Sequence, residues 1–174
     1  VDAGANQSIC EGQSVVLQAS SPQTNQFSWN NDVNNGQSFS PQTTMVYTVT
    51  ATEQGTGCTA TDDVLVTVNP LPEISVLPSA GSGCAPFTLT FANQSVNCAN
   101  ATWTFSNGVV VNGTGNQQLT FTDTGCYDLT LDAVSPFGCN ASASFPSIVC
   151  ALVSPVASFY PEPVILNSEN PSTT

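Results

Sequence analysis

Apolar and polar residues alternate with a period of two along several stretches of this chain, most clearly from Cys126 to Val134. Successive side chains of an extended strand point to opposite faces, so we expect one face of this stretch to be buried and the other solvated. No stretch of about 11 residues or more shows a helical period. The other predicted strands cover residues 14–20, 26–29, 45–52, 63–68, 73–77, 87–92, 102–105, 109–111, 118–121 and 141–149.

A tryptophan on one predicted strand and a tyrosine on a later one occur twice in the chain. Trp103 precedes the turn signal Asn107-Gly108 and is followed by Tyr127, and Trp29 is followed in the same way by Tyr47. Immunoglobulin-type sandwiches place a core tryptophan and a corner tyrosine at such positions. We therefore expect all four rings to be structural rather than ligand-binding. The predicted fold is all-β, with tandem immunoglobulin-like antiparallel β-sandwiches.

Prolines indicate where the chain divides. Pro70-Leu71-Pro72 is predicted to be a stiff linker, because two closely spaced prolines favour extended backbone. Residues 1–69 are predicted to form one sandwich and residues 73–150 a second. Residues 151–174 are expected to begin a further, incomplete sandwich that is too short to fold alone. The chain is therefore expected to be a piece of a longer exported protein.

The charge balance is extreme: 12 acidic residues stand against no Lys, Arg or His, giving a formal net charge of −12. Nothing in the chain can replace the counterions around phosphates, which excludes nucleic acid as a partner. Direct insertion into membranes is not expected either, because no long apolar run is present. Without His, Lys or Arg, the ordinary general bases near neutral pH are missing, so we predict that the chain is not an enzyme.

The acidic residues are spread along the chain rather than gathered in a calcium-loop motif. We expect them to lie on solvated strand faces, and no cofactor or metal is predicted. The acids weighed as possible calcium ligands are Asp62, Asp63, Asp123, Asp128 and Asp132.

Seven cysteines in small β modules favour disulfides and an extracellular location. The chain has no Cys-x-x-Cys motif and no histidine, so its cysteines do not indicate a zinc site. The seven disulfide candidates are Cys10, Cys58, Cys84, Cys98, Cys126, Cys139 and Cys150.

Sandwich topology suggests how these cysteines pair. The loops after the second and sixth strands share one end of a sandwich, which favours Cys98 with Cys139. Cys126 and Cys150 are symmetric about the hairpin near Gly138, and Cys84 is a competing partner for Cys126. Elimination pairs Cys10 with Cys58, although the same topology puts these two at opposite ends of their sandwich. One cysteine remains, either free or bonded to another part of the protein.

Three segments of the second predicted sandwich resemble a PKD domain, a type of immunoglobulin-like sandwich. They are Ser-Gly-Cys-Ala-Pro-Phe-Thr-Leu-Thr-Phe at 82–91, Trp-Thr-Phe-Ser-Asn-Gly at 103–108 and Thr-Gly-Cys-Tyr-Asp-Leu-Thr-Leu at 124–131. Residues 2–12, 44–50 and 57–62 resemble the related modules of giant Bacteroidota surface proteins. PKD domains usually carry the signature Trp-Asp-Phe-Gly-Asp-Gly, and in this chain both of its acidic residues are replaced.

The resemblance implies a segment of a large adhesin exported by type IX secretion and used in adhesion or gliding motility. Neighbouring modules of the same chain are the expected partners, and the resemblance extends this to secretion or outer-membrane anchoring machinery. The predicted function is a non-enzymatic extracellular spacer. Two alternatives are open: a carbohydrate- or calcium-binding module of a secreted hydrolase, and a self-assembling filament subunit.

Overall fold

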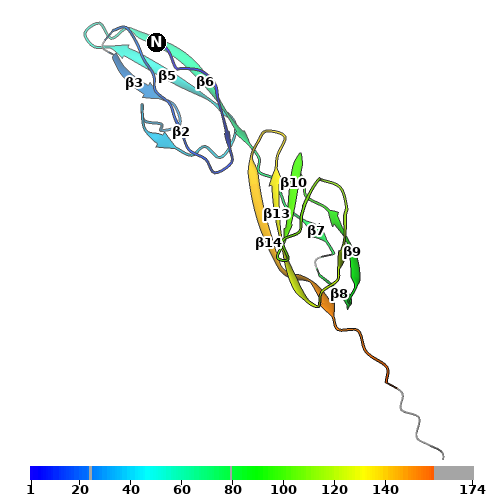
Figure 1. Cartoon of the computed structure of the whole chain (residues 1–174). Coiled ribbons are helices and arrows are strands. Elements are labelled where there is room, and N and C mark those ends of the chain that lie inside the picture. Colours follow the sequence, from blue (N-terminus) through cyan, green and yellow to red (C-terminus); the bar gives the residue numbers. More distant parts are fainter. Residues whose placement is uncertain (24, 79, 159–174) are drawn as a thin grey trace, which may run out of the picture.

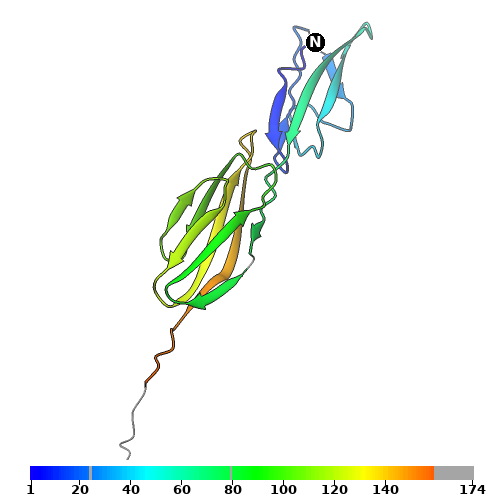
Figure 2. The same ribbon diagram turned by 90° about the vertical axis from the view of Figure 1, so that its right-hand side faces the viewer.

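The computed structural model describes residues 1–23, 25–78 and 80–158, and all the regular structure in this part of the chain is β-strand. Two β-sandwiches follow one another along an elongated body, joined by a short connection (Figure 1). The same end-to-end arrangement is seen after a quarter turn (Figure 2). The fold is therefore a tandem of β-sandwiches, as predicted from the alternating pattern.

The first sandwich contains a four-stranded sheet in the order β1-β6-β5-β3 and a short two-stranded sheet of β2 and β4. Alternation sets which residues are inside: along β5, Tyr47, Val49 and Ala51 are buried. The strands are β1 (Gln7–Cys10), β2 (Val15–Val16), β3 (Asn25–Trp29), β4 (Ser38–Phe39), β5 (Met45–Glu53) and β6 (Thr59–Asn69).

The core of the first sandwich lies between these two sheets. Trp29 and Tyr47 are both buried in it, and the Tyr47 ring meets Phe39 edge-on at 5.2 Å. Burial raises the pKa of the Tyr47 hydroxyl, since a phenolate would lose its hydration there. Residues 14–20, predicted as one strand, form a strand only at Val15–Val16. Beyond it, Leu17 and Ala19 stay buried, but a loop rather than a sheet satisfies their backbone groups.

The second sandwich faces a five-stranded sheet, β11-β10-β13-β14-β8, with a three-stranded sheet, β12-β9-β7. The strands are β7 (Val76–Leu77), β8 (Gly81–Cys84), β9 (Phe87–Asn93), β10 (Asn100–Phe105), β11 (Val110–Asn112), β12 (Gln117–Phe121), β13 (Gly125–Val134) and β14 (Asn140–Leu152).

Aromatic rings fill the core of the second sandwich. Phe91 packs against both Trp103 and Phe105, with ring centroids 6.3 and 5.4 Å away. Trp103 is fully buried, and its indole N–H donates to the Gly113 carbonyl at 2.9 Å. The half-buried Tyr127 donates its hydroxyl to the Asp123 carbonyl at 2.6 Å, which is the expected tyrosine corner.

Three strands lie outside the predicted set: β1, β4 and β8. Two of them add parallel pairs to the otherwise antiparallel sheets, β1 with β6 and β8 with β14. The sequence Gly-Ser-Gly-Cys of β8 has no apolar alternation. Its glycines have a packing role, because a Cβ on Gly83 would lie 2.2 Å from the Phe87 ring. This strand packs closely because its glycines have no side chains, and not because it carries alternating apolar residues.

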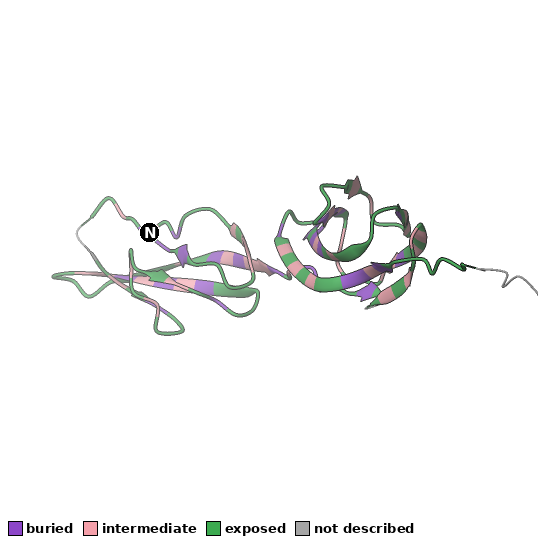
Figure 3. Cartoon of the chain, turned by 60° about the horizontal axis from the view of Figure 1, so that its bottom comes forward, coloured by how far each residue is buried: buried purple, intermediate pink, exposed green. Residues whose placement is uncertain are grey.

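Buried and exposed positions alternate along the strands of both sandwiches, and the chain after β14 is exposed (Figure 3). Residues 153–158 form no strand. The remainder of the predicted third module, residues 159–174, lies outside the described residues.

Candidate functional site: the cross-linked joint

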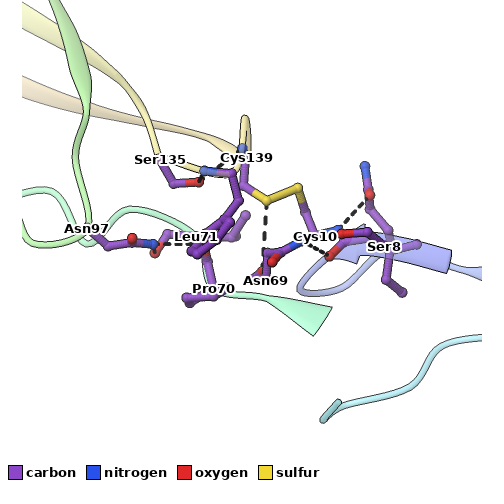
Figure 4. Close-up of a disulfide and its surroundings, with 11 residues drawn as sticks. Ser8, Cys10, Asn69, Pro70, Leu71, Asn97, Ser135 and Cys139 are labelled. Carbon is purple, nitrogen blue, oxygen red and sulfur yellow. Dashed lines mark hydrogen bonds between the residues drawn. A yellow bond between two sulfur atoms is a disulfide. The ribbon is translucent and has the colours of Figure 1, made fainter. Parts of the chain in front are cut away.

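A disulfide connects the two sandwiches. Cys10 is the last residue of β1, and Cys139 immediately precedes β14, 129 positions further along the chain. Their Cα atoms are 5.6 Å apart (Figure 4). The main chain also crosses here, through Pro70, Leu71 and Pro72. The sandwiches are therefore joined by two covalent connections, and we call this region the joint.

The predicted pairings of Cys98 with Cys139 and of Cys10 with Cys58 are wrong. Cys98 and the exposed Cys58 are free thiols. The prediction considered each sandwich by itself, whereas the bond forms between sandwiches. The observation that Cys10 and Cys58 belong to opposite ends was a correct reason to doubt that pair.

The second disulfide pairs Cys126 with Cys150, as favoured from the sequence. These residues lie directly opposite each other on β13 and β14, with Cα atoms 4.0 Å apart. The competing partner, Cys84, is instead free and exposed. Within the described residues, four cysteines are thus bonded and three are free.

Asn69 fixes the end of the first sandwich beside the disulfide. Its buried side-chain amide donates to the Ser8 hydroxyl at 2.8 Å and to the Ile9 carbonyl at 3.1 Å. Its own carbonyl accepts the Glu11 N–H at 2.9 Å. The Cys139 sulfur lies 3.9 Å from the same carbonyl, a contact without a donated proton, because a disulfide sulfur carries none. These bonds hold the ends of β1 and β6 together where both leave the first sandwich.

Asn97 holds the linker from the side of the second sandwich. Its amide donates to the carbonyls of Pro70 and Leu71, at 2.9 and 3.3 Å. Asn97 has a φ of 56°, a left-handed conformation that asparagine tolerates better than most residues. The proline linker is thus tied by side-chain bonds in addition to its intrinsic stiffness.

A tight turn presents Cys139 to the joint. The buried Ser135 hydroxyl accepts the N–H groups of Phe137 and Cys139, at 3.3 and 3.1 Å. Gly138 has a φ of 82°, which glycine adopts without strain. The turn is closed by the Ser135 N–H, which donates to the Cys139 carbonyl at 2.8 Å.

The sequence prediction missed the roles of Asn69, Asn97 and Ser135. One local signal was present, since Ser135-Pro-Phe-Gly-Cys has the composition of a tight turn ending on a cysteine. Asn69 and Asn97 carry no comparable signal, because their partners are distant in sequence: those of Asn69 lie on β1, 60 and 61 positions away, and those of Asn97 lie in the linker, 26 and 27 positions away.

The surface of the joint is shallow. Cys10, Leu71 and Gly138 are among the residues lining a cleft of about 400 Å³. No group of three or more Cys, Asp or Glu residues in the described ranges is placed to hold a metal ion. No helix among these residues is long and apolar enough to span a bilayer. The chemistry that the joint itself displays is covalent and hydrogen-bonded cross-linking.

The acids weighed as calcium ligands have separate surroundings. Asp62 accepts the Ala3 N–H at 2.8 Å, and Asp128 accepts the Ser147 N–H at 2.7 Å on the neighbouring strand. Asp63, Asp123 and Asp132 are exposed. The backbone bond from Ala3 lowers the pKa of Asp62. This carboxylate therefore anchors the N-terminal segment to β6.

No protein-family model and no curated protein sequence matches this chain. Among solved structures, it is similar to Sidekick-1 immunoglobulin domains 1–4, with 16% identity, 87% of this chain and 48% of that chain covered, and a TM-score of 0.47. It is similar to Clostridium thermocellum CbhA fibronectin(III)-like modules, with 10% identity, 91% and 95% covered, and a TM-score of 0.44.

The chain thus spans about half of the Sidekick-1 structure. It also resembles Drosophila OTK extracellular domains 3–5, with 12% identity, 87% of this chain and 60% of that chain covered, and a TM-score of 0.50. At this identity the likeness shows the fold alone: the chain is a tandem of immunoglobulin-like β-sandwiches.

Proposed function

We propose that this chain is a non-enzymatic, extracellular spacer segment of a large secreted bacterial surface adhesin. The observation that carries the proposal is the Cys10–Cys139 disulfide across the joint. A single flexible linker lets two domains reorient freely. Two covalent connections at one joint restrict bending and rotation, which is what a spacer of fixed length needs.

The side-chain bonds at the joint support the same function. Asn69 and Asn97 tie the linker and its flanking strands from both sandwiches. The proline linker removes backbone freedom that a Gly/Ser linker would keep. The joint therefore resists bending through covalent bonds, hydrogen bonds and backbone stiffness together.

An extracellular location follows from cysteine chemistry. Disulfides persist in oxidising compartments and are rare in the cytosol. The uniform negative charge adds mutual repulsion between modules and between neighbouring chains, which favours an extended arrangement. The PKD-like segments at 82–91, 103–108 and 124–131 are the basis for proposing a Bacteroidota adhesin, exported by type IX secretion and acting in adhesion or gliding.

The free thiols of Cys58 and Cys84 provide a direct test of stiffness. Cys58 lies in the turn before β6, and Cys84 ends β8 in the second sandwich. Donor and acceptor dyes on these two cysteines, in a Cys98→Ser background, report the distance across the joint by single-molecule FRET. We expect one narrow distribution when the Cys10–Cys139 bond is intact.

The matched control adds Cys10→Ser and Cys139→Ser, which remove the cross-link and keep the proline linker. We expect its distance distribution to broaden. A broad distribution in the protein with the intact bond would contradict the spacer function. Equally narrow distributions in both proteins would show that the bond is not what stiffens the joint.

A further inference from the structure

Cys84 occupies the same position in the second sandwich that Cys10 occupies in the first. Each is the last residue of a short strand that pairs in parallel with the final strand of its sandwich, Cys10 opposite Asn69 and Cys84 opposite Leu152. The next hydrogen bond is also the same. The Glu11 N–H donates to the Asn69 carbonyl at 2.9 Å, and the Ala85 N–H donates to the Leu152 carbonyl at 2.8 Å.

Cys58 matches Cys139 in the same way. Each cysteine follows a glycine with positive φ, 72° at Gly57 and 82° at Gly138, and immediately precedes the last strand of its sandwich. In both hairpins the cysteine carbonyl closes the turn. It accepts the Glu53 N–H at 2.9 Å in the first and the Ser135 N–H at 2.8 Å in the second.

The chain also enters beside each of these hairpin cysteines. Leu71, in the linker, lines the cleft that contains Gly138 and Asn140 on either side of Cys139. Val1 lines a cleft together with Cys58. A module joined before Val1 would therefore enter the first sandwich where the linker enters the second.

The segment after the second sandwich repeats the spacing of the linker. Pro72 and Ser75 follow Asn69 by three and six positions, and Pro155 and Ser158 follow Leu152 by the same intervals. The end of the second sandwich thus repeats two elements of the joint. One is a cysteine at the end of the parallel strand, and the other is a proline three positions after the residue that pairs with that cysteine.

We propose that Cys58 and Cys84 are the two halves of further inter-module disulfides. Cys84 bonds the hairpin cysteine of the module that follows, and Cys58 bonds the strand-end cysteine of the module that precedes. The partner is another module of this kind, presenting the matching cysteine at the joint. This inference rests on the proposed spacer function, because it requires neighbouring modules in the parent chain.

The bond forms by thiol–disulfide exchange, with a small-molecule or protein disulfide as the oxidant. The two cysteine thiols lose two protons and two electrons and become one disulfide. The oxidant accepts both and leaves as two thiols. Cys58 and Cys84 are exposed, so both are open to this exchange.

Cys98 provides an internal comparison. It is the third free cysteine of the described residues, but it is only partly exposed and lies 3.2 Å from the Asn100 carbonyl. It neither ends a strand paired with a final strand nor precedes a final strand. The proposal therefore predicts that Cys98 stays a thiol when the other two react.

The test is a tandem of two copies, in which residue 157 of the first copy is followed directly by Val1 of the second. At this fusion point Val1 follows Leu152 by six positions, as Ser75 follows Asn69, and Cys10 follows Val1 by the same nine positions by which Cys84 follows Ser75. In the junction tandem, Cys58→Ser in the first copy and Cys84→Ser in the second leave one Cys84 and one Cys58 at the new joint. The outer tandem carries the opposite substitutions and leaves the same two cysteines at the far ends.

Both tandems are oxidised with glutathione disulfide, and cross-linked peptides are quantified by non-reducing mass spectrometry. We expect a Cys58–Cys84 bond in most junction tandems and at least about tenfold less in the outer tandem, since a joint raises the effective concentration of the two thiols. Glutathione adducts at both cysteines without the cross-link, or equal cross-linking in both tandems, would overturn the proposal.

The result of the tandem experiment can be distinguished from the result of the FRET test of the spacer function. The FRET width of the single chain depends on Cys10–Cys139 and not on Cys58 or Cys84 forming bonds. A narrow distribution in the single chain together with glutathione adducts in the junction tandem would overturn the repeated cross-link and leave the spacer function standing.

Discussion

Cys10 and Cys139 make the end of β1 covalently continuous with the start of β14, so a pulling force between the two termini bypasses the 129 chain positions between them. The force passes along β1, through the disulfide and into β14. Both hydrophobic cores lie off this path, apart from the strands that carry the load. The joint is thus also the point where tension moves from one sandwich to the next.

This force path predicts that the contour length between Cys10 and Cys139 cannot be extended while their disulfide is intact. Pulled from its ends in single-molecule force spectroscopy, the oxidised protein should not release residues between the two cysteines. Full reduction should add about 430–460 Å of contour length, since an extended residue spans about 3.3–3.6 Å.

Breaking only one disulfide distinguishes its contribution to the contour length from that of the other. Cys10→Ser opens the long loop but keeps Cys126–Cys150, so its added length should fall short of full reduction by the 24 positions of the smaller loop. Equal contour lengths in the oxidised protein and the Cys10→Ser variant would contradict the force path.

The Asn35 side chain is predicted to stabilise the first sandwich. Its carbonyl oxygen accepts the Ala19 N–H at 2.7 Å and the Trp29 indole N–H at 3.0 Å. Asn35→Ala removes the acceptor from two donors and should lower the free energy of unfolding by about 1–3 kcal/mol. Urea denaturation followed by tryptophan fluorescence measures this loss. Asn34→Ala, at an exposed neighbour, should change stability by less than about 0.5 kcal/mol.

The difference between what the sequence predicted and what it missed follows from the range of each interaction. Trp103 and Tyr127 were predicted because alternation along one strand determines which side chains face the core. Asn35 carried no such signal, since nothing in a polar loop reveals that its side chain meets Trp29.

The inter-module bond was missed for a different reason. Pairing cysteines within one sandwich requires only its topology, whereas Cys10–Cys139 depends on how two sandwiches meet. A signal was nevertheless present. Gly57-Cys58 and Gly138-Cys139 repeat the same dipeptide before the last strand of each sandwich, which marks them as equivalent positions.

Trp103 is predicted to stabilise the second core. Trp103→Phe removes ring volume from a fully buried site and leaves the Gly113 carbonyl without its indole donor. We expect a loss of about 2–4 kcal/mol in the free energy of unfolding, measured by circular dichroism in urea. Val110→Thr, on the exposed side of neighbouring β11, is the control and should cost less than about 0.5 kcal/mol. Equal losses in both variants would contradict this assignment.

The last prediction concerns acid. Asp62 has its pKa lowered below the ordinary value of 3.8, first by the Ala3 N–H, then by its neighbour's backbone N–H. A carboxyl whose pKa is lower in the folded state stabilises that state above its unfolded pKa, and this contribution disappears as the pH falls through the folded value.

Asp62→Asn removes the titration while leaving an amide oxygen able to accept from Ala3. The wild-type protein should therefore have the higher urea midpoint at about pH 6, and the two midpoints should converge toward about pH 2. Asp63→Asn removes a charge from the adjacent, exposed position without touching the Ala3 N–H, and it controls for charge alone. If the gap between wild type and Asp62→Asn stayed constant down to the lowest pH, the Asp62 carboxylate would not be the group that anchors the N-terminal segment.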